Sequence, residues 1–202
     1  MSSKDIIDRS REESNAFSLK CMKFISILSV VDFIIVEINK KGKADAGDWL
    51  ILLSGVAALI PIFYNKFSKD KKNFLNVLLI SSELISIGLY MSSWVYASLA
   101  LLLPFVIGAM YYNSKLLKKL LFIKIPSLIA MSLILYFLYN GKPILNGIVF
   151  AKELAMGSAE YYIIQLIGYG YLFMFLAKKT NSILNSALEQ SEHSEALLNK
   201  VM

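Results

Sequence analysis

The sequence predicts an all-α integral membrane protein, a bundle of six transmembrane helices. Hydrophobic residues make up 56% of the 202 residues, and the mean hydropathy is +0.57, both beyond the usual range of soluble domains. Apolar runs about as long as a bilayer's hydrocarbon core recur along the chain. These runs are continuously apolar, whereas membrane β-strands alternate apolar and polar residues, so helices are favoured over a barrel.

Six apolar runs are the predicted spans, each roughly long enough to cross about 30 Å at 1.5 Å per residue. They cover residues 22–38, 49–64, 74–90, 94–112, 120–139 and 161–177. The fifth run contains Lys124, whose ammonium group we expect to snorkel to the headgroups at a ragged cytoplasmic end. The charged segment before the first run lacks the pattern of a signal peptide, so we expect the first span to remain in the mature protein.

The distribution of positive charge predicts that both ends of the chain lie in the cytoplasm. If the N-terminus is inside, all but five of the 21 Lys and Arg residues fall on the cytoplasmic side, where positive charge is retained. The five on the outer side are Lys40, Lys41, Lys43, Lys142 and Lys152. The predicted division is therefore a cytoplasmic segment over residues 1–21, a membrane domain over 22–178 and a cytoplasmic helical tail over 179–202.

The tail is predicted to continue the sixth helix, because it contains neither Pro nor Gly and is rich in residues that favour helix. Two neighbouring stripes follow a heptad spacing and indicate a coiled-coil seam for a homodimer; the alternative is an amphipathic extension that frays. The first stripe comprises Ile183, Ala187, Gln190, Ser194, Leu197 and Val201, and the second Leu184, Leu188, Ser191, Glu195, Leu198 and Met202. Because a stripe still runs at the last residue, we expect the sequence to be cut from a longer protein.

No catalytic signature is present, so the sequence predicts a protein that is not an enzyme and needs no cofactor. Metal, nucleophile and phosphate-loop motifs are missing, and the one histidine, His193, lies in the tail. The single cysteine, Cys21, can form no disulfide within the chain. The net charge of +6 is explained by topology rather than by nucleic acid binding. The GYGY sequence around Gly168 and Gly170 indicates close helix packing rather than a channel filter.

Two acids inside predicted spans, Asp32 and Glu83, are the first candidate ligand-binding residues. A carboxyl group in hydrocarbon costs several kcal/mol unless it is protonated, paired or wetted. Both acids are expected at a similar depth, so they could line one polar cavity that binds a cationic or hydrogen-bonding ligand. Alternatively, each is satisfied separately by a neighbouring helix. Pro104 and Gly108 fall near the same level, where a proline kink would turn carbonyl groups toward a cavity, although packing alone would also explain them.

Residues nearer the outer surface could form the mouth of such a pocket. Glu37 and Gln165 are the candidate ligand-binding residues there, with Trp49, Tyr161 and Tyr162 beside them. For the three aromatic residues, anchoring at the membrane interface is the alternative explanation.

The sequence KKTNSILNSALEQSEHSEALLNKVM resembles the juxtamembrane helix that leads into a dimeric signalling coiled coil. Together with six helices, short outer loops and cytoplasmic ends, it is similar to the N-terminal membrane sensor region of bacterial signalling proteins, most of all multi-span methyl-accepting chemotaxis receptors. Similar tails precede diguanylate cyclase and histidine kinase domains. The resemblance implies a membrane sensor that passes a helix shift to a cytoplasmic output domain. The alternative is a six-helix transport subunit, similar to the substrate-binding subunits of vitamin uptake systems.

Overall fold

The computed structural model describes residues 3–68, 73–93, 98–111, 113–139, 143–145, 148–149 and 152–201. These residues form helices and short turns, apart from one two-stranded antiparallel hairpin. The elements are α1 (Ser3–Asn39), α2 (Ala46–Phe67), α3 (Phe74–Ser93), η1 (Ser98–Leu102), α4 (Leu103–Met110), α5 (Ser114–Tyr139), β1 (Pro143–Leu145), β2 (Ile148–Val149) and α6 (Lys152–Val201).

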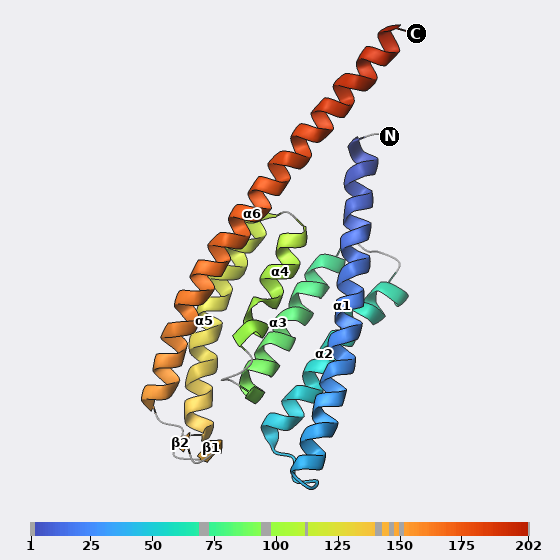
Figure 1. Ribbon diagram of the computed structural model, residues 1–202. Helices are drawn as coiled ribbons and strands as arrows, with labels where there is room; N and C mark the ends of the chain where they lie inside the picture. The colour runs from blue at the N-terminus through green and yellow to red at the C-terminus, as the bar shows by residue number, and fades with distance from the viewer. Residues whose placement is uncertain are drawn as a thin grey trace.

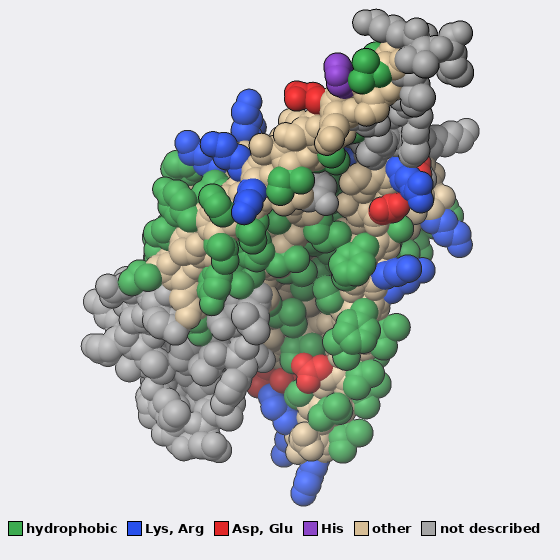
Figure 2. Space-filling model, turned by 45° about the horizontal axis from the view of Figure 1, so that its top comes forward, with side chains coloured by type: hydrophobic (Ala, Val, Ile, Leu, Met, Phe, Trp, Pro, Cys, Tyr) green, Lys and Arg blue, Asp and Glu red, His purple; other side chains and the backbone are tan. Residues whose placement is uncertain are grey.

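Successive helices run in alternating directions, and both termini lie at the same end of the molecule (Figure 1). We call this end the terminal end; the α1–α2 turn and the β-hairpin lie at the opposite end. Helix α2 packs against α1 and α3, α5 packs against α6, and α4 lies between α3 and the α5–α6 pair. On the face shown in Figure 2, hydrophobic side chains cover the middle of the molecule, and Lys and Arg side chains lie toward the terminal end and at the opposite tip.

Within the described part of the chain, three helices are long and apolar enough to cross a membrane: Ala46–Phe67, Phe74–Ser92 and Ser114–Phe137. The predictions of helical spans for the second, third and fifth apolar runs are thereby supported. The fourth apolar run is not among these three, since its described part forms a 3₁₀ segment, η1, followed by the short helix α4. Pro104 lies in the first turn of α4, where its missing N–H group leaves no hydrogen bond unmade, so it starts a helix instead of kinking one.

Small residues bring α1, α2 and α3 close together. A Cβ atom at Gly55 of α2 would lie 2.9 Å from the Cβ of Ser29 on α1, and one at Gly88 of α3 would lie 2.2 Å from the Oγ of Ser54 on α2. The Ser81 hydroxyl on α3 donates a hydrogen bond to the Ala57 carbonyl on α2. Small side chains and short polar contacts of this kind hold helices together where lipid, rather than water, surrounds them.

The packing explanation for the glycines of the sixth apolar run is right for one and wrong for the other. Gly170 is buried, and a Cβ there would lie 3.1 Å from a methyl group of Leu121 on α5. A Cβ at Gly168 would meet nothing within 4 Å. Gly108 of α4 also packs closely, since a Cβ there would lie 2.9 Å from Leu117 of α5.

Helix α6 is continuous over 50 residues, about 75 Å at 1.5 Å per residue. It starts at the β-hairpin, passes along α5 and extends beyond the bundle at the terminal end (Figure 1). The prediction that the tail continues the sixth helix is therefore confirmed. Apolar residues Leu166 and Ala177 are buried in the bundle part of α6.

Candidate functional site

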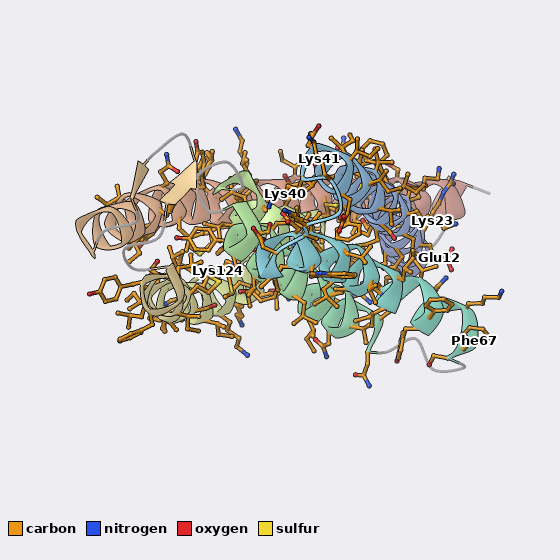
Figure 3. The ribbon with its side chains drawn as sticks, turned by 90° about the horizontal axis from the view of Figure 1, so that it is seen from below. Glu12, Lys23, Lys40, Lys41, Phe67 and Lys124 are labelled. Atoms are coloured by element: carbon orange, nitrogen blue, oxygen red, sulfur yellow. The ribbon has the colours of Figure 1, made fainter. Side chains whose placement is uncertain are left out.

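A buried ion pair joins α3 to α5 near the middle of both helices. The Lys124 ammonium group donates to Glu83 Oε1 at 2.9 Å and to Ser86 Oγ at 2.6 Å. Lys124 is only 1% exposed, whereas the Glu83 side chain is 22% exposed. The expectation that Lys124, labelled in Figure 3, snorkels is wrong, because the residue is buried and its ammonium group donates to Glu83 and Ser86 of α3. Both residues lie about 14–15 Å from the start of their helices.

The local sequence places these partners on one face of α3. Glu83 and Ser86 are three residues apart, so they are neighbours on the helix surface and can share one ammonium group. Seven residues beyond Glu83, the Tyr90 hydroxyl lies 3.3 Å from Ser132 Oγ of α5. The Tyr90 ring also packs edge-on against Tyr162 of α6, with 5.8 Å between the centroids. Polar contacts therefore join α3 to α5 at two levels, and an aromatic contact joins α3 to α6.

Asp32 lies in a different place, in a groove along α1, α2 and α3. The groove has a volume of about 430 Å³. Its lining is apolar except for Asp32 and Ser29; the other lining residues are Ile25, Leu28, Val31, Ile35, Ile51 and Leu89. Asp32 is exposed on α1 and, unlike Glu83, makes no hydrogen bond or ion pair with any residue that the structure describes.

The structure therefore lends no support to one site shared by Asp32 and Glu83. Glu83 is paired with Lys124 of α5, and it does not line the groove that contains Asp32. The alternative of separate satisfaction fits Glu83 well. It does not fit Asp32, which faces the groove without a partner among the described residues.

The remaining candidate residues are not brought together either. Glu37 is half-buried near the end of α1, and Gln165 is half-buried on α6. Pro104 is buried at the start of α4. None of the three lines the described part of this groove, or of the smaller pocket at the terminal end that is described below. Among the aromatic residues proposed for an outer mouth, Trp49 packs on Phe33 with 5.0 Å between the ring centroids, Tyr162 packs on Tyr90, and the Tyr161 side chain lies outside the described residues.

A charged cluster fixes the α1–α2 turn, and sequence reasoning missed it. Lys40 Nζ lies 2.6 Å from Asp48 Oδ2 and 2.9 Å from Asp45 Oδ2, while Asp45 and Asp48 form a capping box at the start of α2. Burial lowers the pKa of Lys40, but its hydrogen bonds to Asp48 and Asp45 outweigh burial and raise the pKa overall. The pattern DAGD before an apolar run was the available signal, since it places an acid at both the N-cap and the N3 position.

A second, smaller pocket lies at the terminal end, where α1, α4 and α6 meet. It has a volume of about 190 Å³. Its described lining comes from three elements: Ser10, Arg11 and Ser14 of α1, Met110 and Tyr111 at the end of α4, and Asn181, Leu184 and Asn185 of α6. The Ser14 hydroxyl donates to the Met110 carbonyl at 3.3 Å, and the Tyr111 hydroxyl donates to Asn15. The N-terminal half of α1 is thus hydrogen-bonded to the end of α4, close to the tail of α6.

The described geometry defines a helical protein with three candidate membrane spans, a buried ion pair and an acid in an apolar groove. No protein-family model matches the chain, and comparisons with curated proteins and with solved structures find no match.

Proposed function

We propose that this chain is the sensory module of a bacterial signal transducer, similar to a chemoreceptor, with six spans in the cell membrane and both termini in the cytoplasm. The observation that carries the proposal is the continuity of α6. One unbroken helix connects the end of the bundle opposite the termini with a tail beyond the bundle. A shift or rotation of α6 among its neighbours would therefore reach the tail without loss at a flexible joint.

The contacts of α6 support this role. It packs on α4 and α5 inside the bundle, and Asn181, Leu184 and Asn185 beyond the bundle share a pocket with α1 and the end of α4. A rearrangement of α1 or α4 would change the packing of α6 at the point where it leaves the bundle. Lys178 and Lys179 mark this exit and would hold it at the cytoplasmic headgroups.

The two stripes of the tail differ in exposure, and this difference supports a dimer. In the second stripe, Leu184 is half-buried and Leu188 is only 8% exposed, so these two residues face the protein's own chain. In the first stripe, Ile183 is 61% and Leu197 50% exposed. Apolar residues at heptad spacing on the free face of a helix suit a parallel partner helix, here the tail of a second copy.

Signalling would follow from a population shift between two arrangements of the bundle. A ligand that binds one arrangement more tightly raises the population of that arrangement, and at saturation it multiplies the equilibrium constant by the ratio of its two affinities. The dimeric tail would pass that shift to a cytoplasmic output domain of the chemoreceptor, cyclase or kinase class.

Disulfide cross-linking in membranes tests the dimer. In a Cys21→Ser background, Ala187→Cys and Ser194→Cys place thiols on the first stripe, while Glu189→Cys and Ala196→Cys place thiols on the other side of the helix. All four positions are exposed, so accessibility is matched. We expect the first pair to give a product at twice the 22.7 kDa monomer mass and the control pair to give much less. Equal cross-linking at all four positions, or none, contradicts a tail dimer through this face.

A helical phase change tests transmission and separates a sensor from the alternative, a transport subunit. The chain is fused after Met202 to a dimeric output domain of measurable activity, and one residue is inserted after Lys179. The insertion rotates the tail by about 100° relative to the bundle, so a sensor should change its output activity. One inserted heptad after Lys179 is the control, because seven residues turn the helix by about 700°, within about 20° of two full turns. If the single insertion leaves output unchanged, the transducer proposal is wrong and transport becomes the better explanation.

A further inference from the structure

We propose that the groove along α1, α2 and α3 binds an organic cation with an apolar body, and that the Asp32 carboxylate is its counter-ion. This inference rests on the proposed function, because Asp32 lies within hydrocarbon only if α1 is one of the spans. It goes further by naming the class of ligand and the site that the ligand occupies.

The position of the groove places Asp32 about two helical turns from the end of the bundle opposite the termini. Asp32 precedes the end of α1 by seven residues, Ile51 follows the start of α2 by five, and Leu89 precedes the end of α3 by four. At 1.5 Å per residue, these residues lie roughly 6–10 Å from the end of the bundle opposite the termini. The groove thus begins below the interface, in the half of the membrane farther from the tail.

The charge of Asp32 needs a partner at this depth. Two acids of the neighbouring helices have lysine partners: Glu83 of α3 has Lys124 and Asp48 of α2 has Lys40. Asp32 has no such partner among the described residues, and the described lining of the groove holds no Lys, Arg or His. An ionised carboxylate in an apolar setting is unfavourable unless a cation or hydrogen-bond donors accompany it. A bound cation supplies this partner.

The lining decides what kind of cation fits. A metal ion such as Ca²⁺ or Mg²⁺ takes six or more oxygen ligands, whereas the described lining offers only the Asp32 carboxylate and the Ser29 hydroxyl as polar side-chain groups. The rest is aliphatic, and about 430 Å³ is the volume of a small organic molecule site. Leu28, Val31 and Ile35 are themselves exposed, so the groove opens sideways and an apolar cation dissolved in the bilayer could enter it directly.

A ligand in this groove would act on a helix contact. Ser29 lines the groove and also packs against Gly55 of α2. Because α1 continues from this contact to the pocket that it shares with α6, a change in its packing could reach the tail.

Binding of tetraphenylphosphonium, an apolar cation, tests the proposal on the full chain in lipid nanodiscs. Tetraphenylborate is the control ligand, because it has nearly the same shape and the opposite charge. Glu37→Gln is the matched control variant, since Glu37 is an acid of the same helix that does not line the groove. We expect Asp32→Asn to weaken tetraphenylphosphonium binding by about tenfold or more and to leave tetraphenylborate binding unweakened. Glu37→Gln should change the binding of neither ion. Leu89→Trp, which fills the groove, should weaken binding of the cation as well.

Equal tetraphenylphosphonium binding by wild type and Asp32→Asn overturns the proposal, as does an equal loss in Glu37→Gln; the groove then faces lipid or a second copy of the chain. The assay needs no output domain and no dimer. Its failure is therefore distinct from failure of the tail experiments, which test the sensory function itself.

Discussion

Lys124 holds a positive charge between two apolar helices, and its position there depends on Glu83. Burying an ion pair gains little over a well-packed apolar pair, because both charges lose hydration. Removing one partner is much worse, since the other charge then stays buried alone. We therefore expect Lys124→Met to destabilise the folded protein by about 3–5 kcal/mol, measured as reversible unfolding in detergent or bicelles.

The double variant Lys124→Met with Glu83→Gln separates the charge from the packing. It removes both charges, so it should recover most of the lost stability. Lys119→Met is the control, because Lys119 is an exposed residue of the same helix, and we expect it to change stability by less than about 0.5 kcal/mol. A double variant as unstable as Lys124→Met alone would show that the loss comes from packing rather than from the unpaired carboxylate.

The α1–α2 turn should respond to pH at both extremes. Burial raises the pKa of Asp45, but hydrogen bonds from Lys40 and from the Asp48 and Gly47 amides outweigh burial and lower the pKa overall. The stabilisation that ionised Asp45 gives to the turn is complete above the ordinary pKa of an aspartate and is lost as pH falls through the lowered pKa. The pKa of Lys40 is raised, so its contribution is complete below the ordinary pKa of lysine and is lost as pH rises through the raised pKa.

We accordingly expect protection of the Gly47 and Asp48 amides to be constant across neutral pH and to fall in strong acid and strong base. Hydrogen exchange, corrected for the intrinsic rate at each pH, measures this protection. Asp45→Asn keeps a side-chain oxygen for capping but removes the charge, so it should abolish the acid limb. If that limb persists in Asp45→Asn, another group is responsible for it.

At the scale of the helices, Gly55 decides how closely α1 approaches α2. A Cβ there would lie 2.9 Å from the Ser29 Cβ and 3.3 Å from the Ser26 carbonyl oxygen, and neither atom is the end of a flexible side chain. Gly55→Val must therefore push the two helices apart. We expect a loss of about 1–3 kcal/mol, measured by unfolding in bicelles. Gly168→Val is the control, because nothing lies within 4 Å of its Cβ position; equal losses in the two variants would contradict a steric cause.

Helices set by local hydropathy could be predicted from the sequence, and contacts between distant residues could not. The apolar runs that became α2, α3 and α5 are visible in composition alone. The partner of Lys124 lies 41 residues away, so a lysine near the end of an apolar run reads equally well as one that snorkels. The sequence offered two signals for the ion pair: Lys124 in the fifth apolar run and Glu83 in the third. Pro104 was identified as a candidate from the sequence. A proline that kinks a helix and a proline that starts one cannot be distinguished in the sequence unless the conformation of the preceding residues is known.

For the candidate site, Asp32 was found because an acid in an apolar run stands out by itself. Its groove could not be predicted, because the walls come from three helices and their shape depends on the Gly55 and Gly88 contacts. Pairing Asp32 with Glu83 rested on equal depth along two helices. Depth fixes one coordinate only, and the direction in which each side chain points depends on rotations that the sequence leaves open.

For the whole molecule, alternating helix directions place both termini at one end (Figure 1), which agrees with the even number of spans that the charge distribution predicts. Labelling of single cysteines with a membrane-impermeant maleimide in intact cells tests this topology, again in a Cys21→Ser background. Lys43→Cys lies in the α1–α2 turn, Ser10→Cys near the start of α1, and Ser194→Cys in the tail. We expect Lys43→Cys to be labelled from outside, because the positive-inside rule assigns the α1–α2 turn to the outer surface.

Ser10→Cys and Ser194→Cys should be labelled only after the cells are permeabilised. The two positions act as controls for each other, because any even number of crossings leaves them on the same side of the membrane. If only one of them is labelled in intact cells, the number of crossings is odd, and α1, η1 with α4, or α6 fails to span. If both are labelled and Lys43→Cys is not, six crossings remain possible but the orientation is reversed. In that case the tail would lie outside the cell, where a cytoplasmic output domain could not follow it.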